Sequence, residues 1–408
     1  MRKRRVVITG LGAVSPFGWN MESLTTGLEK GECALSLLPE SSFIDGIKVR
    51  VRGVAPDFNV KVIPREHRRV MPHMGVMAFI AACEALRQAG IEPTAPLAEP
   101  YRQMGSCIAA TTVSPNTLED FFGTFLKNRQ VDTIKSTVFF KAMGHAVPSN
   151  LNVIFGLSGR CLSPAAACAS ALQSIGLAYE TIAFGKAGLM LCGGVEEYHA
   201  LLSATFDRIG AASHNPLPQE ASRPFDLRRD GIVCSEGAGI FLLEEYEQAR
   251  ARGAEILAEV TGFGTNTSPS SVVFPDENAI ESCMRQALDD AGIPPQAVDL
   301  VNAHATATGS GDIAEGRAIA RVFGSRTPVN SLKGYLGHCM AASGSLELAA
   351  VLDAARKGFV HGTRNLAEPD PRCGELMLDA DHKKRQTTCL LKNSFGLGGV
   401  NASLVVNI

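Results

Sequence analysis

Short apolar runs that end in glycine alternate along the chain with longer segments in which apolar residues recur every three or four positions. The short runs are rich in β-branched and aliphatic residues, which is typical of buried strands, whereas the longer segments have the period of helices. This alternation predicts an α/β protein. The clearest predicted strands lie at residues 6–12, 189–194, 238–245, 300–304 and 389–399.

Three predicted helices end in a glycine that can adopt the left-handed conformation found at helix C-termini. They span residues 75–90, 277–292 and 343–358. The segment from about residue 119 to residue 152 is the least regular part of the chain. We expect loops or a contact with a partner there.

A break near residues 250–253 divides the chain into two predicted units, residues 1–250 and 251–408. Patterns on the two sides resemble each other. ACASALQSIGLA and MAASGSLELAAVL both open an apolar helix with small residues, and CGGVEE and GLGGVNAS both pass from a strand into a Gly-Gly-Val turn. These patterns alone leave an internal duplication and a chance similarity equally open.

Composition and charge exclude several classes of function. A chain of 408 residues is long enough for two domains or two closely packed halves. Its 39 basic and 41 acidic residues nearly balance, which argues against nucleic-acid binding. The N-terminal MRKRRVVITG reads as a first strand, and the 11 cysteines lack the spacing of zinc ligands or a disulfide framework. We expect a cytoplasmic protein with no bound metal and no membrane insertion.

Cys168 lies within SPAAACASALQSI, at the start of a predicted helix and among small residues. A helix N-terminus offers unpaired N–H groups and the positive end of the helix dipole, so we expect a lowered thiol pKa. Small neighbours also leave room for a bulky substrate. Taken alone, however, the stretch fits a buried structural cysteine better than a nucleophile.

Two histidines lie in loops of the kind that hold active sites. His304 follows a buried strand in VNAHATATGSGD, where strand ends of α/β folds bind ligands. His338 lies in NSLKGYLGHCMAASG, between glycines and ahead of a helix. The other seven histidines have no such setting. A lone histidine is more often structural, so only the combination with Cys168 indicates chemistry.

Four motifs in order, together with two flanking segments, connect these residues to a known family. ACASA, NAHATAT, SLKGYLGH and NSFGLGGVNA resemble the signatures of the elongating β-ketoacyl-acyl carrier protein synthases of ketosynthase I and II type. RVVITGLGAVSPFG and RPFDLRRDGIVCSEGAGIFLLEE extend the resemblance over nearly the whole chain. It implies the thiolase fold, in which two βαβαβαββ halves form a five-layered α-β-α-β-α sandwich. Members dimerise through the N-terminal half.

The resemblance also assigns roles in a decarboxylative Claisen condensation. Cys168 accepts an acyl group as a thioester, and the backbone N–H groups of Cys168 and Leu397 match the oxyanion hole. His304 and His338, as neutral imidazoles, hydrogen-bond the malonyl thioester carbonyl and stabilise the enolate. The chain is thereby extended by two carbons, and the substrates arrive on the phosphopantetheine of an acyl carrier protein without a further cofactor.

Charged and peripheral residues match the family as well. Lys333 organises the charges near the two histidines, and we expect it to pair with Glu315. For two groups among the remaining matches a structural role is also open: Thr306 and Thr308 can cap the loop after the strand, and the cluster of three arginines can be a solvated surface. The remaining matches are Asp312 and Phe395 as supporting residues, Thr306 and Thr308 at the pantetheine arm, Thr111 and Thr112 with Leu397 in the acyl pocket, and Arg65, Arg68 and Arg69 in carrier-protein docking.

Departures from the pattern fall in the pocket. The family's GFGGTN reads GLGGVN here, so Leu397 replaces a gating phenylalanine and Val400 replaces threonine, and Ala305 stands where HGTxT has glycine. These changes favour, beside a fatty-acid enzyme, the catalytic subunit of a specialised type II polyketide, aryl-polyene or unusual-lipid pathway. Such a subunit works beside a chain-length factor, so a homodimer and a heterodimer are both open.

Other condensing enzymes and scaffolds fit less well. A thiolase needs a second cysteine in the C-terminal loop, where this chain has Asn401. An initiating or chalcone-type enzyme has a Cys-His-Asn set, whereas His338 occupies the third position here. A non-catalytic scaffold or chain-length factor would not need Cys168, His304 and His338 together.

Overall fold

The computed structural model describes residues 3–40 and 44–408. Within them, eleven strands form one sheet in the order β12-β10-β9-β14-β15-β8-β1-β7-β6-β4-β5. The first half of the chain supplies β1 (Val6–Val14), β4 (Gly105–Ala109), β5 (Cys161–Leu162), β6 (Leu189–Glu196) and β7 (Gly237–Glu245). The second half supplies β8 (Ala258–Thr267), β9 (Leu300–Asn302), β10 (Pro328–Asn330), β12 (Met377–Leu378), β14 (Cys389–Phe395) and β15 (Val400–Asn407).

The two halves repeat one topology. Numbered within each half, five strands have the same spatial order, 3-2-4-5-1, in β5-β4-β6-β7-β1 and in β10-β9-β14-β15-β8. Corresponding neighbours also pair in the same sense: the first two pairs are parallel and the last two antiparallel. This agreement shows the internal duplication that the sequence patterns left open.

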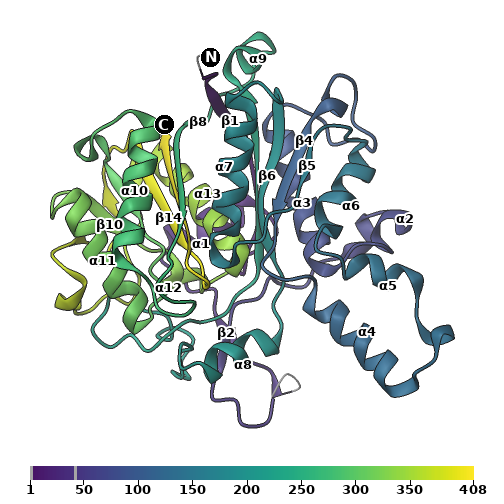
Figure 1. The fold of residues 1–408 in the computed structure, drawn as a ribbon, viewed down its shortest axis with the longest axis horizontal. Coiled ribbons are helices and arrows are strands. Elements are labelled where there is room, and N and C mark those ends of the chain that lie inside the picture. The colour runs from purple at the N-terminus through teal and green to yellow at the C-terminus, as the bar shows by residue number, and fades with distance from the viewer. Residues whose placement is uncertain (1–2, 41–43) are drawn as a thin grey trace.

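Helices complete a five-layered sandwich (Figure 1). Among the described residues, the two half-sheets join only where residues 6–8 of β1 pair with residues 258–260 of β8. They enclose α7 (Ser170–Ala183) and α13 (Ser343–Arg356). The outer layers are α3 (His73–Gln88) with α6 (Ala146–Phe155) on one side, and α10 (Glu277–Ala291) with α11 (Gly309–Phe323) on the other. The predicted thiolase fold is confirmed.

The two central helices are buried on almost every face and pack closely against each other. A Cβ atom on Gly344 would lie 2.4 Å from Cδ1 of Leu172, so a larger residue would force this side chain to move or the two helices to separate. Each helix follows a 3₁₀ turn, η5 (Ala167–Ala169) before α7 and η7 (Met340–Ala342) before α13. The duplication therefore brings two equivalent helix starts together at the centre of the molecule.

The predicted strands and helices are present, with small shifts at their ends. The three helix-ending glycines, Gly90, Gly292 and Gly358, have φ angles of 74°, 67° and 79°, as left-handed C-terminal residues do. The prediction of loops over residues 119–152 is wrong. This segment lies largely in α4 (Pro115–Asn128), α5 (Ser136–Lys141) and α6, because Leu118, Phe121, Phe122 and Phe125 recur at helical spacing.

The remaining elements lie at the periphery. The exception is α12 (Lys333–Leu336), whose four residues are all buried. The break near residues 250–253 falls at the end of α9. Among the described residues, every helix is too short or too polar to cross a membrane. The peripheral elements are α1 (Met21–Glu29), α2 (Arg65–Arg68), α8 (Ala200–Arg208), α9 (Tyr246–Ala251), β2 (Ser36–Leu37), β3 (Val51–Arg52), β11 (Phe359–Val360) and β13 (Lys383–Lys384).

Candidate active site

Cys168 lies in the tight turn that precedes α7. Its neighbour Ala167 has a φ of 48°, a conformation that is unfavourable for a residue with a Cβ atom. The Ser170 hydroxyl accepts from the N–H of Ala166 (2.8 Å) and donates to the carbonyl of Ala167 (2.6 Å), which holds the turn. The thiol is consequently fixed at the helix start, with the residue only 7% exposed.

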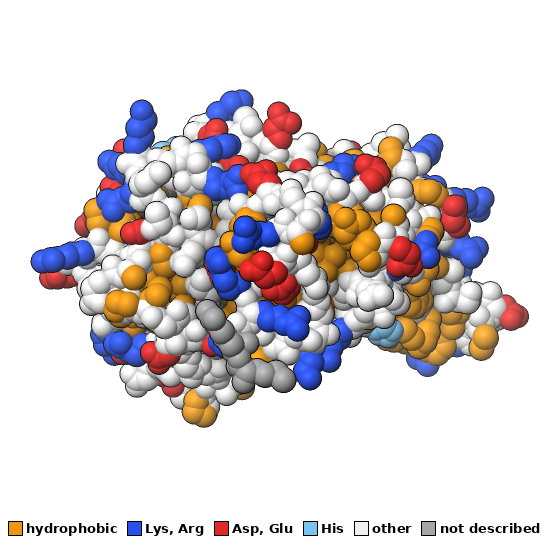
Figure 2. Space-filling model, turned by 90° about the horizontal axis from the view of Figure 1, so that it is seen from above, with side chains coloured by type: hydrophobic (Ala, Val, Ile, Leu, Met, Phe, Trp, Pro, Cys, Tyr) orange, Lys and Arg blue, Asp and Glu red, His pale blue; other side chains and the backbone are white. Residues whose placement is uncertain are grey.

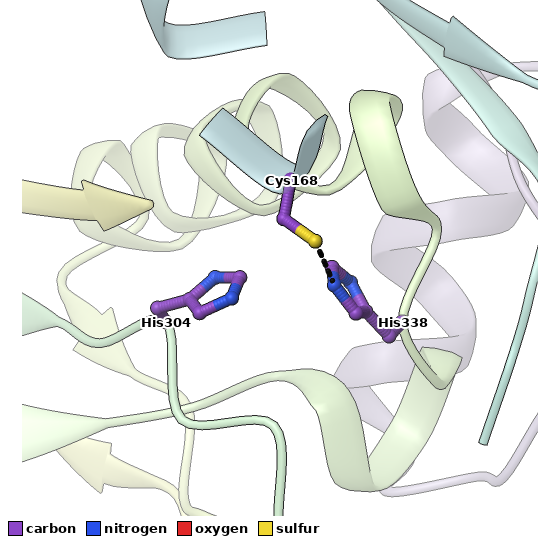
Figure 3. Close-up of side chains that lie close together, drawn as sticks. All are labelled: Cys168, His304 and His338. Carbon is purple, nitrogen blue, oxygen red and sulfur yellow. Dashed lines mark hydrogen bonds between the residues drawn. The ribbon is translucent and has the colours of Figure 1, made fainter. Parts of the chain in front are cut away.

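His338 and His304 face this thiol from two loops of the second half (Figure 3). Nε2 of His338 lies 3.0 Å from Sγ of Cys168, and its Nδ1 is 2.8 Å from the hydroxyl of Ser343. The ring of His304 stands nearly perpendicular to that of His338, with centroids 5.1 Å apart. One donor atom from each of the three residues lies within 4.8 Å of the others.

Glu315 holds the His304 loop. Its two carboxylate oxygens accept from the backbone N–H groups of His304 (2.8 Å) and Ala305 (2.6 Å). Nδ1 of His304 is buried without a partner among the described residues, and the ring of Phe395 lies at a centroid distance of 6.1 Å. The imidazole is thus positioned through its backbone, and its ring is left available to a substrate.

Both imidazoles are neutral at physiological pH. Burial holds the pKa of His304 and of His338 well below the usual value of 6.5, and the charges of Lys333 and Lys392 lower both further. This confirms the expected neutral state. The Ser343 hydroxyl can donate to or accept from Nδ1 of His338, so Nε2 of that ring can either take up or donate a proton.

The pKa of Cys168 is raised to about 11 by burial, so the predicted lowering is wrong. The charge of Lys333 and the backbone N–H groups of Leu397 and Cys168 act in the opposite direction but do not outweigh desolvation. The thiol therefore stays protonated until a base removes its proton. Nε2 of His338 is placed to do so.

The two residues predicted to form an oxyanion hole lie beside the sulfur. The backbone N–H groups of Cys168 and Leu397 are both directed at Sγ, although the two residues lie on different halves of the chain. Leu397 belongs to the turn between β14 and β15 and is 44% exposed. These donors can stabilise negative charge on an oxygen that forms beside the thiol.

Lys333 pairs with Glu347 and not with Glu315, so that expected pair is wrong. Its Nζ donates to Oε1 of Glu347 (2.6 Å), and both side chains are at most 2% exposed. Glu315 is instead occupied by backbone N–H groups and by Nδ2 of Asn393 (3.2 Å). Glu347 reaches Lys333 from α13, whereas Glu315 lies on α11.

The donor set of Cys168, His304 and His338 resembles that of a soft-metal site. However, Lys333 and Lys392 both lie close enough to lower the pKa of each histidine. Two buried cations beside the site disfavour a divalent metal. The arrangement suits an anionic intermediate better.

A cavity of about 340 Å³ leads to this site. It is lined by the three site residues, by Thr306 and Thr308, and by apolar side chains of α8 and of the loop after β8. The two threonine hydroxyls are 3.1 Å apart, and Thr308 also caps α11 through the N–H of Gly311 (3.2 Å). The cavity is thus largely apolar, and the two threonine hydroxyls supply polar groups in its wall.

Two models of one protein family match this chain, one for each half. The family model for the β-ketoacyl synthase N-terminal domain matches residues 3–249, and that for the C-terminal domain matches residues 257–367. The chain belongs to the β-ketoacyl synthase family. It is an acyltransferase of the ketosynthase type, as its full-length relatives are.

Three ketosynthases illustrate the similarity. 3-Oxoacyl-[acyl-carrier-protein] synthase 1 of Escherichia coli K12 is 32% identical over 99% of this chain and 98% of its own. A β-ketoacyl synthase from Burkholderia phymatum is 35% identical over 99% of both chains, with a TM-score of 0.94. The ketosynthase of a type II polyketide synthase, solved with its acyl carrier protein and bound to a hexaketide, is 30% identical over 99% of both chains, with a TM-score of 0.89.

Other predicted ketosynthase residues lie outside the cavity. The N–H of Thr111 and the hydroxyl of Thr112 donate to Glu196 (3.1 and 3.3 Å), and neither threonine lines the cavity. Asp312 accepts from the N–H of Phe225 (2.8 Å) and lies 3.8 Å from Arg229, so it holds a neighbouring loop.

The predicted docking residues Arg65, Arg68 and Arg69 lie on or directly after α2, at the edge of the molecule beyond α3 (Figure 1). None of them lines the cavity in this chain.

Four further residues of the site were not predicted from the sequence. Ser343 binds His338, Glu347 and Lys392 belong to a buried ion cluster, and Glu196 lies near Cys168 with a pKa raised to about 7 by burial. A charged residue within an apolar strand or helix was the available signal, as in CLLKNSF and SLELAAVL.

Proposed function

We propose that this ketosynthase condenses an acyl group held on Cys168 with malonyl-acyl carrier protein, with loss of carbon dioxide. The observation that carries the proposal is the position of the Cys168 sulfur. It lies between two backbone N–H donors and 3.0 Å from His338, with His304 across the cavity. A nucleophile, an oxyanion hole and two neutral imidazoles are the groups that this reaction needs.

In the first half-reaction, Cys168 attacks the thioester of an acyl carrier protein. His338 takes the thiol proton through Nε2, and the N–H groups of Cys168 and Leu397 stabilise the tetrahedral oxyanion. Collapse of the intermediate breaks the bond to the phosphopantetheine sulfur. That sulfur receives the proton from His338, and the acyl group remains on Cys168.

In the second half-reaction, His304 and His338 donate hydrogen bonds to the thioester oxygen of the malonyl group. The carbon–carboxylate bond breaks, carbon dioxide leaves, and the electron pair forms the enolate. Its carbon attacks the acyl carbonyl, and the Cys168 sulfur leaves as a thiolate that takes up one proton from solvent. Each oxyanion-type donor of this kind contributes about 2.7–4 kcal/mol of transition-state stabilisation.

The carrier protein is the proposed macromolecular partner. Its support is the similar polyketide ketosynthase that was solved in complex with an acyl carrier protein. Thr306 and Thr308 offer hydroxyl groups to the pantetheine arm in the cavity. Arg65, Arg68 and Arg69 form a basic segment that suits the acidic surface of a carrier protein. The substrate brings its own phosphopantetheine, so the proposal includes no other cofactor.

A dimer is the proposed assembly, as a homodimer or with a chain-length-factor-like partner. β5 pairs only with β4 among the described residues, so it leaves an open sheet edge. Apolar side chains gather at the same end of the molecule (Figure 2), where Phe122, Leu126 and Phe139 are each at least half exposed. Apolar surface beside an open strand edge favours pairing with a second ketosynthase.

A polyketide or polyene substrate is the second candidate. Leu397 lies at the cavity beside Cys168, where a flexible aliphatic side chain replaces the family's aromatic ring. This favours rigid or polar acyl chains that a phenylalanine would exclude. The similar ketosynthase bound to a hexaketide supports the same alternative.

Incubation with acyl- and malonyl-carrier proteins tests the function. We expect a 3-oxoacyl-carrier protein that is two carbons longer, detected by mass spectrometry, and none from Cys168→Ala. Cys33→Ala is the matched control, because this cysteine is partly exposed and lies outside the cavity and away from β5. Saturated acyl groups of graded length and polyene acyl groups separate the two substrate classes. Product from Cys168→Ala at the wild-type rate would contradict the mechanism.

A further inference from the structure

Lys392 is a second buried lysine beside the active site, and the reaction described above does not use it. It lies on β14, and its side chain is fully buried. Nζ donates to Oε2 of Glu347 (2.5 Å) and, over a longer distance, to the carbonyl of Ala303 (3.4 Å). Ala303 directly precedes His304. The side chain therefore connects β14 with the loop that carries a catalytic imidazole.

Glu347 is shared by two cations. Lys333 donates to one carboxylate oxygen and Lys392 to the other, and all three side chains are at most 2% exposed. When all three are ionised, the cluster carries one positive charge in excess. Burial of a charge without a partner is costly, so such an excess is unusual in a protein interior.

The groups around Lys392 define where this charge acts. Glu347 faces it from α13, Lys333 from α12, and Glu315 from α11. His304 lies on the loop before α11, and His338 on the loop between α12 and α13. Glu315 forms no ion pair with either lysine among the described residues, and burial raises its pKa, which favours its neutral form. The excess charge therefore lies beside the two imidazoles, where the proposed reaction develops negative charge on an oxygen.

We propose that Lys392 is a positioning residue that, with Lys333 and Glu347, places excess positive charge beside His304 and His338 and thereby favours the enolate. The inference rests on the proposed condensation. Positive charge in a region of low dielectric stabilises an enolate held by the two imidazoles. The same charge opposes protonation of His304 and His338, whose neutral forms the reaction requires.

Decarboxylation of malonyl-carrier protein in a Cys168→Gln background tests this role, because neither acyl transfer nor thiol titration contributes there. Rates are measured from about pH 5 to about pH 9, with Lys392→Gln as the variant. Glutamine can still donate to Glu347 but carries no charge. Lys383→Gln is the matched control, since Lys383 is an exposed lysine on β13.

We expect Lys392→Gln to lower kcat about tenfold at neutral pH, equivalent to about 1.4 kcal/mol of barrier, with an unchanged KM. The acidic limb of the pH profile should move to higher pH, because the histidines lose a neighbouring cation and protonate more readily. Lys383→Gln should leave the rate and the profile unchanged. Lys392→Met, which fills the site with an apolar chain, gives the same comparison if the glutamine variant does not fold.

A Lys392→Gln enzyme with the parental kcat and acidic limb would overturn the inference. The inference would also be overturned if Lys392→Met lowered kcat and Lys392→Gln kept the parental kcat, because a hydrogen bond without charge would then suffice. If the Cys168→Gln parent itself decarboxylates nothing at any pH, the proposed function fails first. An active parent with unaffected Lys392 variants removes only the role of Lys392.

Discussion

Glu347→Gln tests the charge cluster most severely, because this substitution removes the anion between two buried lysines. The side chain keeps its size, but Lys333 and Lys392 lose their common partner at 2.6 and 2.5 Å. Breaking a buried ion pair by removal of one partner costs about 3–5 kcal/mol. Since two lysines depend on the same carboxylate, we expect the free energy of unfolding to fall by at least about 3 kcal/mol.

Urea unfolding of the wild type and of Glu347→Gln measures this difference. Glu29→Gln is the control, because Glu29 pairs with Lys357 at 2.5 Å on the surface, where the two side chains are 38% and 46% exposed. An exposed pair of this kind contributes at most about 1 kcal/mol. If Glu347→Gln destabilises the protein no more than Glu29→Gln does, the reasoning about a buried, ionised cluster is refuted.

Four further predictions concern single side chains of the site. His304→Ala should slow malonyl decarboxylation about 100- to 1000-fold, while acyl transfer to Cys168 in a mass-spectrometric assay continues. Ser343→Ala should raise the activation barrier by about 1 kcal/mol and lower kcat roughly fivefold, because the hydrogen bond to His338 is lost. An unchanged kcat would contradict the role of Ser343. Leu397→Ala should leave the initial rate of acyl transfer within about threefold of wild type, because the oxyanion hole uses only the backbone N–H, and a larger loss would show that the side chain contributes. Burial raises the folded-state pKa of Glu196 from 4.5 to about 7, so its stabilising contribution is present at pH 4 and lost as pH rises through 7. In urea unfolding, the stability of the wild type relative to Glu196→Gln should therefore decrease by about 3 kcal/mol between about pH 4 and pH 8. A difference that does not change with pH would contradict the assignment.

Much of the fold was predictable because its elements are strongly patterned. Buried strands appear as continuous apolar runs, and the long helices end at glycines with positive φ, such as Gly292. The duplication was only faintly visible, since it lies in the order and direction of strand pairing, which few local residues record. Residues 119–152 were misread although apolar residues recur there at helical spacing, because no residue of α4 or α5 is fully buried and the apolar face does not contribute to the core.

The site residues that lie in a sequence motif were predictable. Contacts between segments that are distant in the sequence were not. Cys168, His304 and His338 lie in recognisable segments, and the structure brings them together. The partner of Lys333 was not predictable, because Glu347 approaches from another helix in three dimensions. The thiol pKa was misjudged for a similar reason: a helix start is visible in the sequence, but the burial that outweighs it depends on the packing of both halves.

Transfer of an acyl group to Cys168 is the most direct test of the account. The protein is incubated with an acyl-carrier protein alone, digested, and examined by mass spectrometry for acylated peptides. We expect the acyl mass on the peptide that contains Cys168 and on none that contains another of the 11 cysteines. Absence of the acyl group from Cys168 with every carrier tested, or its presence on a different cysteine, would contradict the central claim.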